Sequence, residues 1–441
     1  MNEKVNKRVL NVLNKYSNKE MQKKYLTKET AFSREETQKM TFEDMTMFVL
    51  ANTGKSLSLE ILKYFNDTSN IENTITKQAV SKQRQFIKSK IFDDMNISYA
   101  KEIYLARNET FCGYNLIAID GSTAEIPNTQ NLKKIFGEAK ASETSASNAR
   151  VGLNGFYDAI NHIMIKLVVD KYQKGEKTVF LENVEDVIRT LSDKKLLFIF
   201  DRGYICLELL IRLEELGIKY LFRVASNCYK NELKSAKSLD ENINIKITKA
   251  RLKNMDEERQ KEYLKKQYKK ERLVQVELDT GEIEYLITNL SQEEVAYEKM
   301  KELYYERWNI EKAFNILKNR LHIENISART KNGVEQDIKA TVFLGNIVED
   351  MSVELNKSLS VKKSQEYEYR TNINILAGIL KTYFIYFFCT QAINEKLREH
   401  YYKEMLKYIK KNLVLVKKGK KNPRNKRVSR NKYKTNIRKN Y

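Results

Sequence analysis

Two short apolar runs, each followed directly by an aspartate, constrain the fold of this chain most. Residues 116–119 read Leu-Ile-Ala-Ile and precede Asp120, and residues 196–200 read Leu-Leu-Phe-Ile-Phe and precede Asp201. Short apolar runs bounded by polar residues are typical of strands buried inside a sheet. An aspartate directly after such a strand is expected at the rim of the sheet, next to solvent.

The segments around these runs alternate between strand and helix patterns. Residues 149–157 and 163–170 predict a strand pair with a turn at 158–161. The other expected elements are helices at 176–192 and 207–216 and strands at 219–224 and 284–289. This order predicts an α/β fold in which helices cover a mixed sheet.

The charge balance points to a polyanionic partner. The 441 residues contain 80 Lys plus Arg against 58 Asp plus Glu, a formal net charge of +22. This excess favours nucleic acid as the partner over an acidic membrane surface. The length predicts about two to four domains. The four cysteines and three histidines show no spacing typical of a zinc site or a disulfide framework.

No membrane segment is expected. The first residues lack the apolar stretch of a signal peptide. The most apolar segment, 373–389, is interrupted by Asn374, Gly378 and Lys381. It is shorter than the roughly 20 apolar residues of a membrane span, so we expect a buried helix there.

Residues 1–105 follow helical periodicity and include one strongly basic stretch. The segment 76–90 has an N-cap signal, an amphipathic pattern and five basic residues. It predicts part of a helix-turn-helix, with Lys77, Lys82 and Arg84 as DNA contacts. A basic surface helix in a helical domain explains the same pattern, and the sequence leaves both interpretations open.

Two further segments are basic. Residues 249–272 are dense in charge and are expected to belong to an insertion with a basic surface. The last 25 residues, 417–441, hold twelve Lys or Arg and no acid. Such a block is typically disordered when free and favours DNA contact over a merely solubilising role. The expected contacts are Lys421, Arg424, Arg427 and Arg430.

A polar stripe on one helix is the most specific feature. Residues 299–332 contain no Gly or Pro, which predicts a single helix. At about 100° per residue, Tyr304, Arg307, Glu311 and Lys318 fall within about 60° of one another, beside the apolar face. A solvated face would lie opposite the core, so this stripe is expected to line a groove.

These groups suit phosphodiester chemistry. If the two strands are neighbours, Asp120 and Asp201 converge, and Glu311 can complete a cluster of the oxygen ligands that Mg²⁺ or Mn²⁺ prefers. Arg307 and Lys318 can hold phosphate oxygens. The alternatives are aspartates that cap loops and a ladder of surface ion pairs along the helix.

The motifs of this chain resemble those of a known protein family. The spacing Tyr-x2-Arg-x3-Glu-x6-Lys is similar to the YREK signature of DDE insertion-sequence transposases, in particular the insertion-sequence-four family. The resemblance covers residues 75–390 approximately. The motifs that carry it are IAIDGST at 117–123, the strand pair at 149–170, LFIFDRGY at 197–204, YLITNL at 285–290 and YYERWNIEKAFNILKNR at 304–320.

The resemblance implies an RNase H-like catalytic core interrupted by a β-rich insertion domain. The implied parts are a helical N-terminal DNA-binding domain (1–105), the first part of the core (106–227), the insertion domain (228–290), the second part of the core with the signature helix (291–345), a helical C-terminal region (346–416) and a basic tail (417–441).

The resemblance also implies a cut-and-paste reaction. Asp120, Asp201 and Glu311 would be the catalytic residues and the ligands of two Mg²⁺ or Mn²⁺ ions. The implied DNA contacts on the signature helix are Tyr304, Arg307, Trp308 and Lys318. The implied partners are double-stranded DNA, as transposon terminal inverted repeats and as target, and a second copy of the chain in a paired-end complex. The implied location is the bacterial cytoplasm, at the nucleoid when DNA is bound.

One departure from the family bears on the mechanism. Some relatives stack a flipped base on a tryptophan of the insertion domain, whereas the single tryptophan here is Trp308 on the signature helix. Either a tyrosine such as Tyr285 replaces that platform or base flipping differs. Two other functions stay open: a catalytically inert DNA-binding regulator, and an RNase H-like nuclease without strand transfer.

Overall fold

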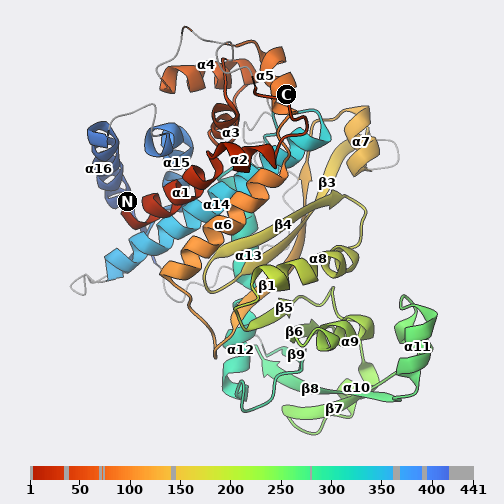
Figure 1. Ribbon diagram of the computed structural model, residues 1–441. Helices are drawn as coiled ribbons and strands as arrows, with labels where there is room; N and C mark the ends of the chain where they lie inside the picture. The colour runs from red at the N-terminus through yellow and green to blue at the C-terminus, as the bar shows by residue number, and fades with distance from the viewer. Residues whose placement is uncertain are drawn as a thin grey trace. The chain divides into compact units, whose positions relative to one another are not determined.

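The computed structural model forms two compact units (Figure 1). It describes residues 3–33, 39–68, 72, 75–140, 146–278, 281–360, 368–389 and 395–416. The helical unit comprises residues 1–106, 123–151 and 314–441, and the sheet unit comprises residues 107–122 and 152–313. Three elements contain points where the chain passes between the units: β1 (Asn115–Glu125), β3 (Asn148–Asp158) and α13 (Trp308–Asn319).

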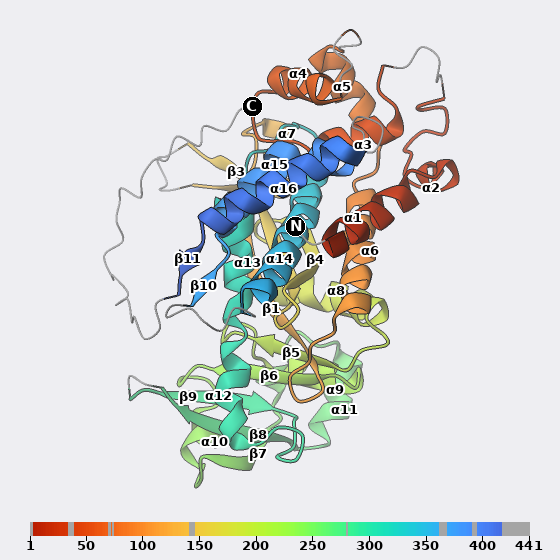
Figure 2. The same cartoon turned by 90° about the vertical axis from the view of Figure 1, so that its left-hand side faces the viewer.

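The helical unit combines both ends of the chain. Its helices are α1 (Glu3–Tyr16), α2 (Lys19–Lys23), α3 (Phe42–Leu50), α4 (Leu57–Asp67), α5 (Lys77–Arg84), α6 (Lys90–Ala106), α7 (Gln130–Phe136), α14 (Lys331–Ser360), α15 (Ile373–Phe388) and α16 (Glu395–Lys411). Its short strands are β2 (Glu138–Ala139), β10 (Tyr369–Arg370) and β11 (Val414–Leu415). Helices α1, α6 and α14 lie side by side, and α16 lies along α15 (Figure 2).

A buried polar contact joins N-terminal helices of this unit to α14, which lies much later in the sequence. Arg8 of α1 donates to Asp350 of α14 at 2.7 Å, and Tyr99 of α6 donates to the same carboxylate oxygen at 2.8 Å. Loss of either partner would leave a buried charge poorly compensated, so the contact helps to fix how the three helices pack. The apolar segment 373–389 forms α15 with seven buried side chains, which confirms the expected buried helix. Among the described helices, none is both long enough and apolar enough to cross a membrane.

The sheet unit contains the predicted mixed sheet. Its further elements are β4 (Ile163–Lys171), α8 (Glu176–Thr190), β5 (Leu196–Phe200), α9 (Leu207–Glu215), β6 (Lys219–Val224), α10 (Lys230–Lys234), β7 (Asp240–Lys246), the 3₁₀ helix η3 (Lys249–Leu252), α11 (Glu257–Leu264), β8 (Tyr268–Glu277), β9 (Ile283–Thr288) and α12 (Tyr297–Tyr305). Within the sheet unit the strand order is β3-β1-β5-β6-β9-β8-β7, and β4 pairs with β3. Strands β1, β5 and β6 are parallel, whereas β9, β8 and β7 continue the sheet antiparallel. The α/β class and the predicted strand pair are confirmed.

Both faces of this sheet are covered. Phe180 of α8 packs against Phe198 and Phe200 of β5, with ring centroids 5.8 and 5.1 Å apart. Ile310, at the start of α13, packs against Gly155 of β3, where an added Cβ would lie 3.3 Å from its methyl carbon. Because both faces are buried, the central strands need the continuous apolar runs seen in the sequence.

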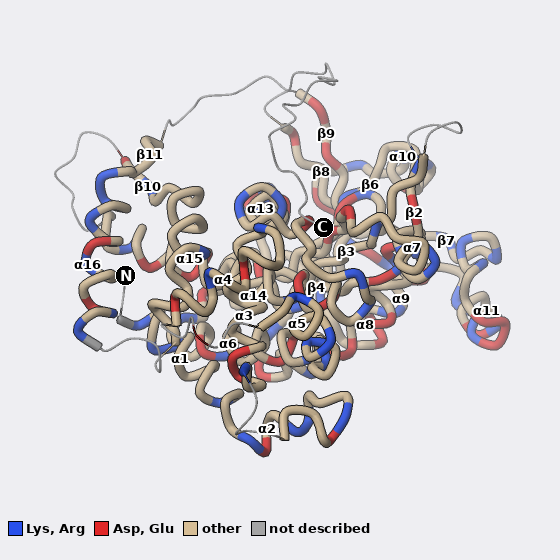
Figure 3. The backbone as a smooth tube through the Cα atoms, turned by 90° about the horizontal axis from the view of Figure 1, so that it is seen from above, with Lys and Arg blue, Asp and Glu red and all other residues tan. Residues whose placement is uncertain are grey.

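The segment 228–290 differs from the expected insertion domain. Its strands β7, β8 and β9 extend the edge of the central sheet, and the whole segment belongs to the sheet unit. Lys/Arg and Asp/Glu alternate along α11 and its flanks (Figure 3). Arg259 and Lys269 form ion pairs at 2.5 Å with Glu215 and Glu214 of α9. Part of the basic surface expected for residues 249–272 therefore holds this segment to α9.

Candidate active site

Asp120 and Asp201 follow the last pair of a parallel ladder. In that ladder Ile119 of β1 pairs with Phe200 of β5. Neighbouring strands lie about 4.8 Å apart, so the two aspartates stand next to each other beyond the ladder. The prediction that their strands are neighbours is confirmed. Strand β1 continues past Asp120, so only Asp201 follows the end of its strand directly.

Asp120 lies in a partly buried and acidic setting. Burial raises the pKa of its carboxyl to about 6; Arg307 and the backbone N–H of Gly121 oppose this shift, and Glu176 and Glu311 add to it. The Gly121 N–H donates to Oδ1 at 2.9 Å. This setting disfavours the charged carboxylate unless a further cation compensates it.

Asp201 has an orphaned carboxylate oxygen. Its Oδ1 atom is buried and has no hydrogen-bond partner among the described residues. A buried polar atom without a partner costs about 1–3 kcal/mol. Asp201 interacts electrostatically with Arg307, Tyr304 and Glu284. Its free oxygen is thus open to a cation or a hydrogen-bond donor.

Arg307 connects Glu311 to the two aspartates. Its guanidinium donates to Glu311 Oε1 at 3.1 Å and interacts electrostatically with both aspartates. Its Cζ lies 4.6 Å from the ring centroid of Trp308 and 5.7 Å from that of Tyr304. The Arg307 side chain is 3% exposed, whereas that of Glu311 is 44% exposed. Arg307 is therefore a buried counter-ion of the acidic groups and not a surface ion-pair partner.

The segment 299–332, which contains Tyr304, Arg307, Glu311 and Lys318, is not one helix. Helix α12 ends at Tyr305, and α13 begins at Trp308 after a tight turn at Glu306 and Arg307. Within this turn Asn309 N donates to Glu306 O at 3.0 Å, and the Asn309 side chain donates to Glu306 Oε2 at 2.6 Å. An i,i+3 backbone bond of this kind takes the place of the i,i+4 bond of a regular α-helix. The prediction of one helix over 299–332 was wrong, both here and beyond the end of α13.

Tyr304 adds a buried donor to the site. Its hydroxyl is buried and has no hydrogen-bond partner within the described part of the chain. It interacts electrostatically with Asp201, Glu284, Arg307 and Arg223. Arg223 pairs with Glu284 at 2.9 Å. Two further charged residues, neither predicted from the sequence, are therefore part of these surroundings: Glu284 interacts with Asp201, and Arg223 pairs with Glu284.

Glu176, the first residue of α8, was also missed. A Cβ on Gly121 would lie 2.0 Å from Glu176 Oε1, so this carboxylate lies against the backbone beside Asp120. Burial raises the pKa of Tyr204, and the charges of Glu176, Asp120 and Asp201 add to the shift. The sequence hint is Gly121 itself, which leaves the space that Glu176 occupies. Only the packing of α8 on the sheet shows what fills that space.

The two aspartates fit a hard divalent cation. Among the described residues, no three His, Cys, Asp or Glu side chains come close enough together to hold a metal ion. The pair nevertheless offers oxygen donors alone, one orphaned and one in a setting that favours an added cation. Those are the donors that Mg²⁺ and Mn²⁺ prefer.

The residues predicted on the basic N-terminal helix divide into two groups. Lys77 and Lys82 are exposed on α5. Arg84 is 3% exposed, and its guanidinium donates to Gln336, Ser327, the carbonyl of Gly333 and Asp337. Arg84 was expected to contact DNA. Instead, its buried side chain connects α5 to α14 and to Ser327 in the loop before α14.

The other residues predicted to contact DNA belong to α13, β9 and the C-terminal tail. Lys318 is in the last turn of α13, in the helical unit, and Trp308 begins that helix in the sheet unit. Tyr285 lies in β9, paired with Val224 of β6. The tail residues Lys421, Arg424, Arg427 and Arg430 lie outside the described residues.

Comparison with known proteins identifies a family for this chain. A solved structure that matches is the cryo-EM structure of the piggyBac transposase synaptic complex with hairpin DNA, at 10% identity and a TM-score of 0.44, covering 90% of this chain and 84% of that chain. No curated protein matches the sequence. The model of the transposase DDE domain matches residues 112–346, which include both strand-borne aspartates and the signature segment. The chain therefore belongs to the transposase DDE domain family.

Proposed function

We propose that this chain is a cut-and-paste DNA transposase with an RNase H-like catalytic core. It binds transposon ends as double-stranded DNA, cleaves them and joins the 3′-OH ends to target DNA. The proposal rests on one arrangement within the sheet unit. Asp120 lies within β1, and Asp201 directly follows the neighbouring parallel strand β5. Glu311 is hydrogen-bonded to Arg307, which interacts electrostatically with both aspartates. Membership of the transposase DDE domain family supports it.

In this proposal Asp120, Asp201 and Glu311 hold two Mg²⁺ or Mn²⁺ ions. When bound, the ions polarise the scissile phosphate and increase the acidity of the attacking water or hydroxyl. Arg307 offsets the charge of the carboxylates. Together with the buried hydroxyl of Tyr304 it supplies donors for phosphate oxygens. Since water and the DNA 3′-OH are the nucleophiles, no Ser or Tyr nucleophile is needed.

The finer assignment follows the signature spacing. We propose that the chain is an insertion-sequence transposase of the insertion-sequence-four family, with Tyr304, Arg307, Glu311 and Lys318 as its YREK residues. Trp308, Lys77, Lys82 and the tail are proposed to contact DNA, and two copies are proposed to act in a paired-end complex. A cytoplasmic location at the bacterial nucleoid follows from this function.

The proposal is tested with the DNA that flanks the gene. A plasmid carrying both flanks as candidate terminal repeats is incubated with the purified protein in Mg²⁺, Mn²⁺, Ca²⁺ or EDTA. We expect excision and joined products in Mg²⁺ or Mn²⁺, and DNA binding without cleavage in Ca²⁺. Cleavage without joining would instead identify a nuclease. Binding without cleavage in every metal would identify an inert regulator.

A further inference from the structure

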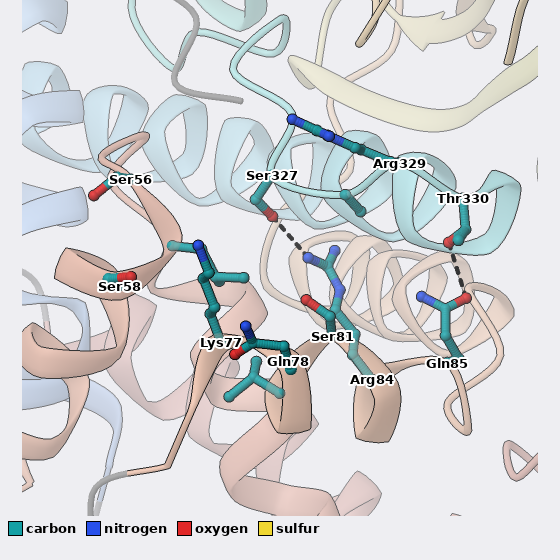
Figure 4. Close-up of a pocket in the computed structure, with 13 residues that line it drawn as sticks. Ser56, Ser58, Lys77, Gln78, Ser81, Arg84, Gln85, Ser327, Arg329 and Thr330 are labelled. Carbon is teal, nitrogen blue, oxygen red and sulfur yellow. Dashed lines mark hydrogen bonds between the residues drawn. The ribbon is translucent and has the colours of Figure 1, made fainter. Parts of the chain in front are cut away.

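A pocket of about 610 Å³ lies in the helical unit (Figure 4). Three chain segments form it: the start of α4, helix α5 with the residue after it, and the loop before α14. Seven of its lining residues carry hydroxyl or amide side chains: Ser56, Ser58, Gln78, Ser81, Gln85, Ser327 and Thr330. Lys77, Arg84 and Arg329 add positive charge, and no lining residue is acidic.

The walls of the pocket are held in place by hydrogen bonds. Arg84 donates to Ser327 at 2.7 Å and to Asp337 at 2.5 Å. Thr330 donates to Gln85 at 2.8 Å. These bonds fix the loop 327–330 against α5, so the pocket exists before any ligand binds. Because Asp337 neutralises Arg84, the uncompensated charge of the pocket comes from the other two cations.

Those two cations line the pocket from different segments. Lys77 is the first residue of α5, and Arg329 lies in the loop before α14 (Figure 4). Both are exposed, and neither side chain forms an ion pair or hydrogen bond with the described residues. A lysine at a helix N-terminus is unfavourable, because it adds to the positive end of the helix dipole. An anion in the pocket would relieve this repulsion.

The helix ends around the pocket add to its positive potential. Helices α4, α5 and α14 all begin at residues that line it or directly follow a lining residue. Neither α5 nor α14 has an acidic residue in its first turn, whereas α4 has Glu60 there. At the start of α4, the N-cap Ser56 makes no side-chain capping bond. Free donors and aligned dipoles of this kind favour phosphate oxygens.

We propose that this pocket binds a phosphodiester segment of DNA, with Lys77 and Arg329 as its cationic contacts. The choice of DNA rests on the proposed function. The volume exceeds what a single phosphate group needs and is open to a backbone segment with its sugar. The hydroxyl and amide groups supply neutral donors along that backbone, as is usual in protein–DNA contacts.

The test measures DNA affinity of the full-length protein in EDTA. Binding of a fluorescein-labelled DNA duplex is followed by anisotropy over a range of salt concentrations. We expect Lys77→Ala and Arg329→Ala each to weaken binding about ten- to a hundredfold, the usual effect of removing a charged hydrogen bond. The slope of log K against log salt should become shallower by about 0.9 for each phosphate that the variant no longer neutralises. Ser81→Glu, which adds an anion at the pocket, should weaken binding as well.

Lys101→Ala is the matched control, because Lys101 is an exposed lysine of α6 in the same unit and does not line the pocket. Unchanged affinity and salt slope in both alanine variants and in Ser81→Glu would overturn the proposal, even if the protein still excises DNA. Binding of inorganic phosphate as tight as that of the duplex would identify a small-anion site and overturn it too. If the pocket variants lose DNA affinity while the wild type never cleaves, the pocket stands and the proposed function fails.

Discussion

At the scale of single residues, Asp120 makes the metal-free protein sensitive to pH. Its pKa is about 6 in the folded chain against an ordinary 3.8. A raised folded pKa contributes stability below the unfolded value, and that stability is lost as pH rises through the folded value. In EDTA, Asp120→Asn should therefore raise the free energy of unfolding at pH 8 by up to about 2–3 kcal/mol. At pH 4 it should change little.

Urea unfolding at the two pH values measures this difference. Asp193→Asn is the control, because the Asp193 side chain is 72% exposed and its substitution should give no such pH dependence. An Asp120→Asn effect of equal size at pH 4 and pH 8 would contradict the acidic setting described for Asp120.

The contact between Gly121 and Glu176 leads to a second prediction at this scale. A methyl group at Gly121 would overlap the Glu176 carboxylate and displace it from its place beside Asp120. Gly121→Ala and Glu176→Gln should each slow DNA cleavage, and the double variant should be no slower than the more impaired single variant. Gly378→Ala is the control, since nothing lies within 4 Å of the added methyl. If the losses of cleavage rate in the two single variants instead add up in the double variant, the two residues act independently.

At the scale of elements, the turn between α12 and α13 depends on Asn309. Asn309 is 8% exposed, and its side chain donates to Glu306 and to the carbonyl of Ala159 at 3.1 Å, which ties α13 to the β3–β4 turn. Asn309→Ala should lower the free energy of unfolding by about 1–3 kcal/mol, because a buried carbonyl loses its partner. Asn319→Ala, at the exposed end of α13, should leave the urea midpoint nearly unchanged. Equal midpoints in the two variants would refute this role.

The elements also show what local sequence patterns can and cannot predict. Apolar runs and turn residues predicted β1, β5, β6 and the β3–β4 pair, because these patterns reflect burial on a sheet. The helix break at Glu306 was missed because no Gly or Pro marks it, and the periodicity of apolar residues does not report a turn of this kind. Arg84 was misassigned for a related reason: its buried partner Asp337 is distant in sequence. That Asp120 and Asp201 lie at neighbouring strands was predictable, whereas Glu176 comes near Asp120 only through packing.

At the scale of the whole molecule, positive charge is concentrated at the C-terminal end of the sequence. Residues 417–441 carry twelve of the 80 Lys and Arg residues and no acid. Removing them should weaken binding to any DNA sequence and make the slope of log K against log salt shallower by about 0.9 for each phosphate that the tail neutralises. Anisotropy titrations of the truncated and full-length chains give this slope. An unchanged slope would show that the tail does not touch phosphate.

The central claim is that Asp120, Asp201 and Glu311 act together to cleave DNA. The most direct measurement is a gel assay of end cleavage in Mg²⁺ for the three single alanine variants, with a binding assay on the same DNA. Each variant should lose cleavage to background while retaining DNA binding, and Asp193→Ala should cleave like the wild type. An Asp201→Ala protein that cleaves at the wild-type rate would contradict the assignment of the site.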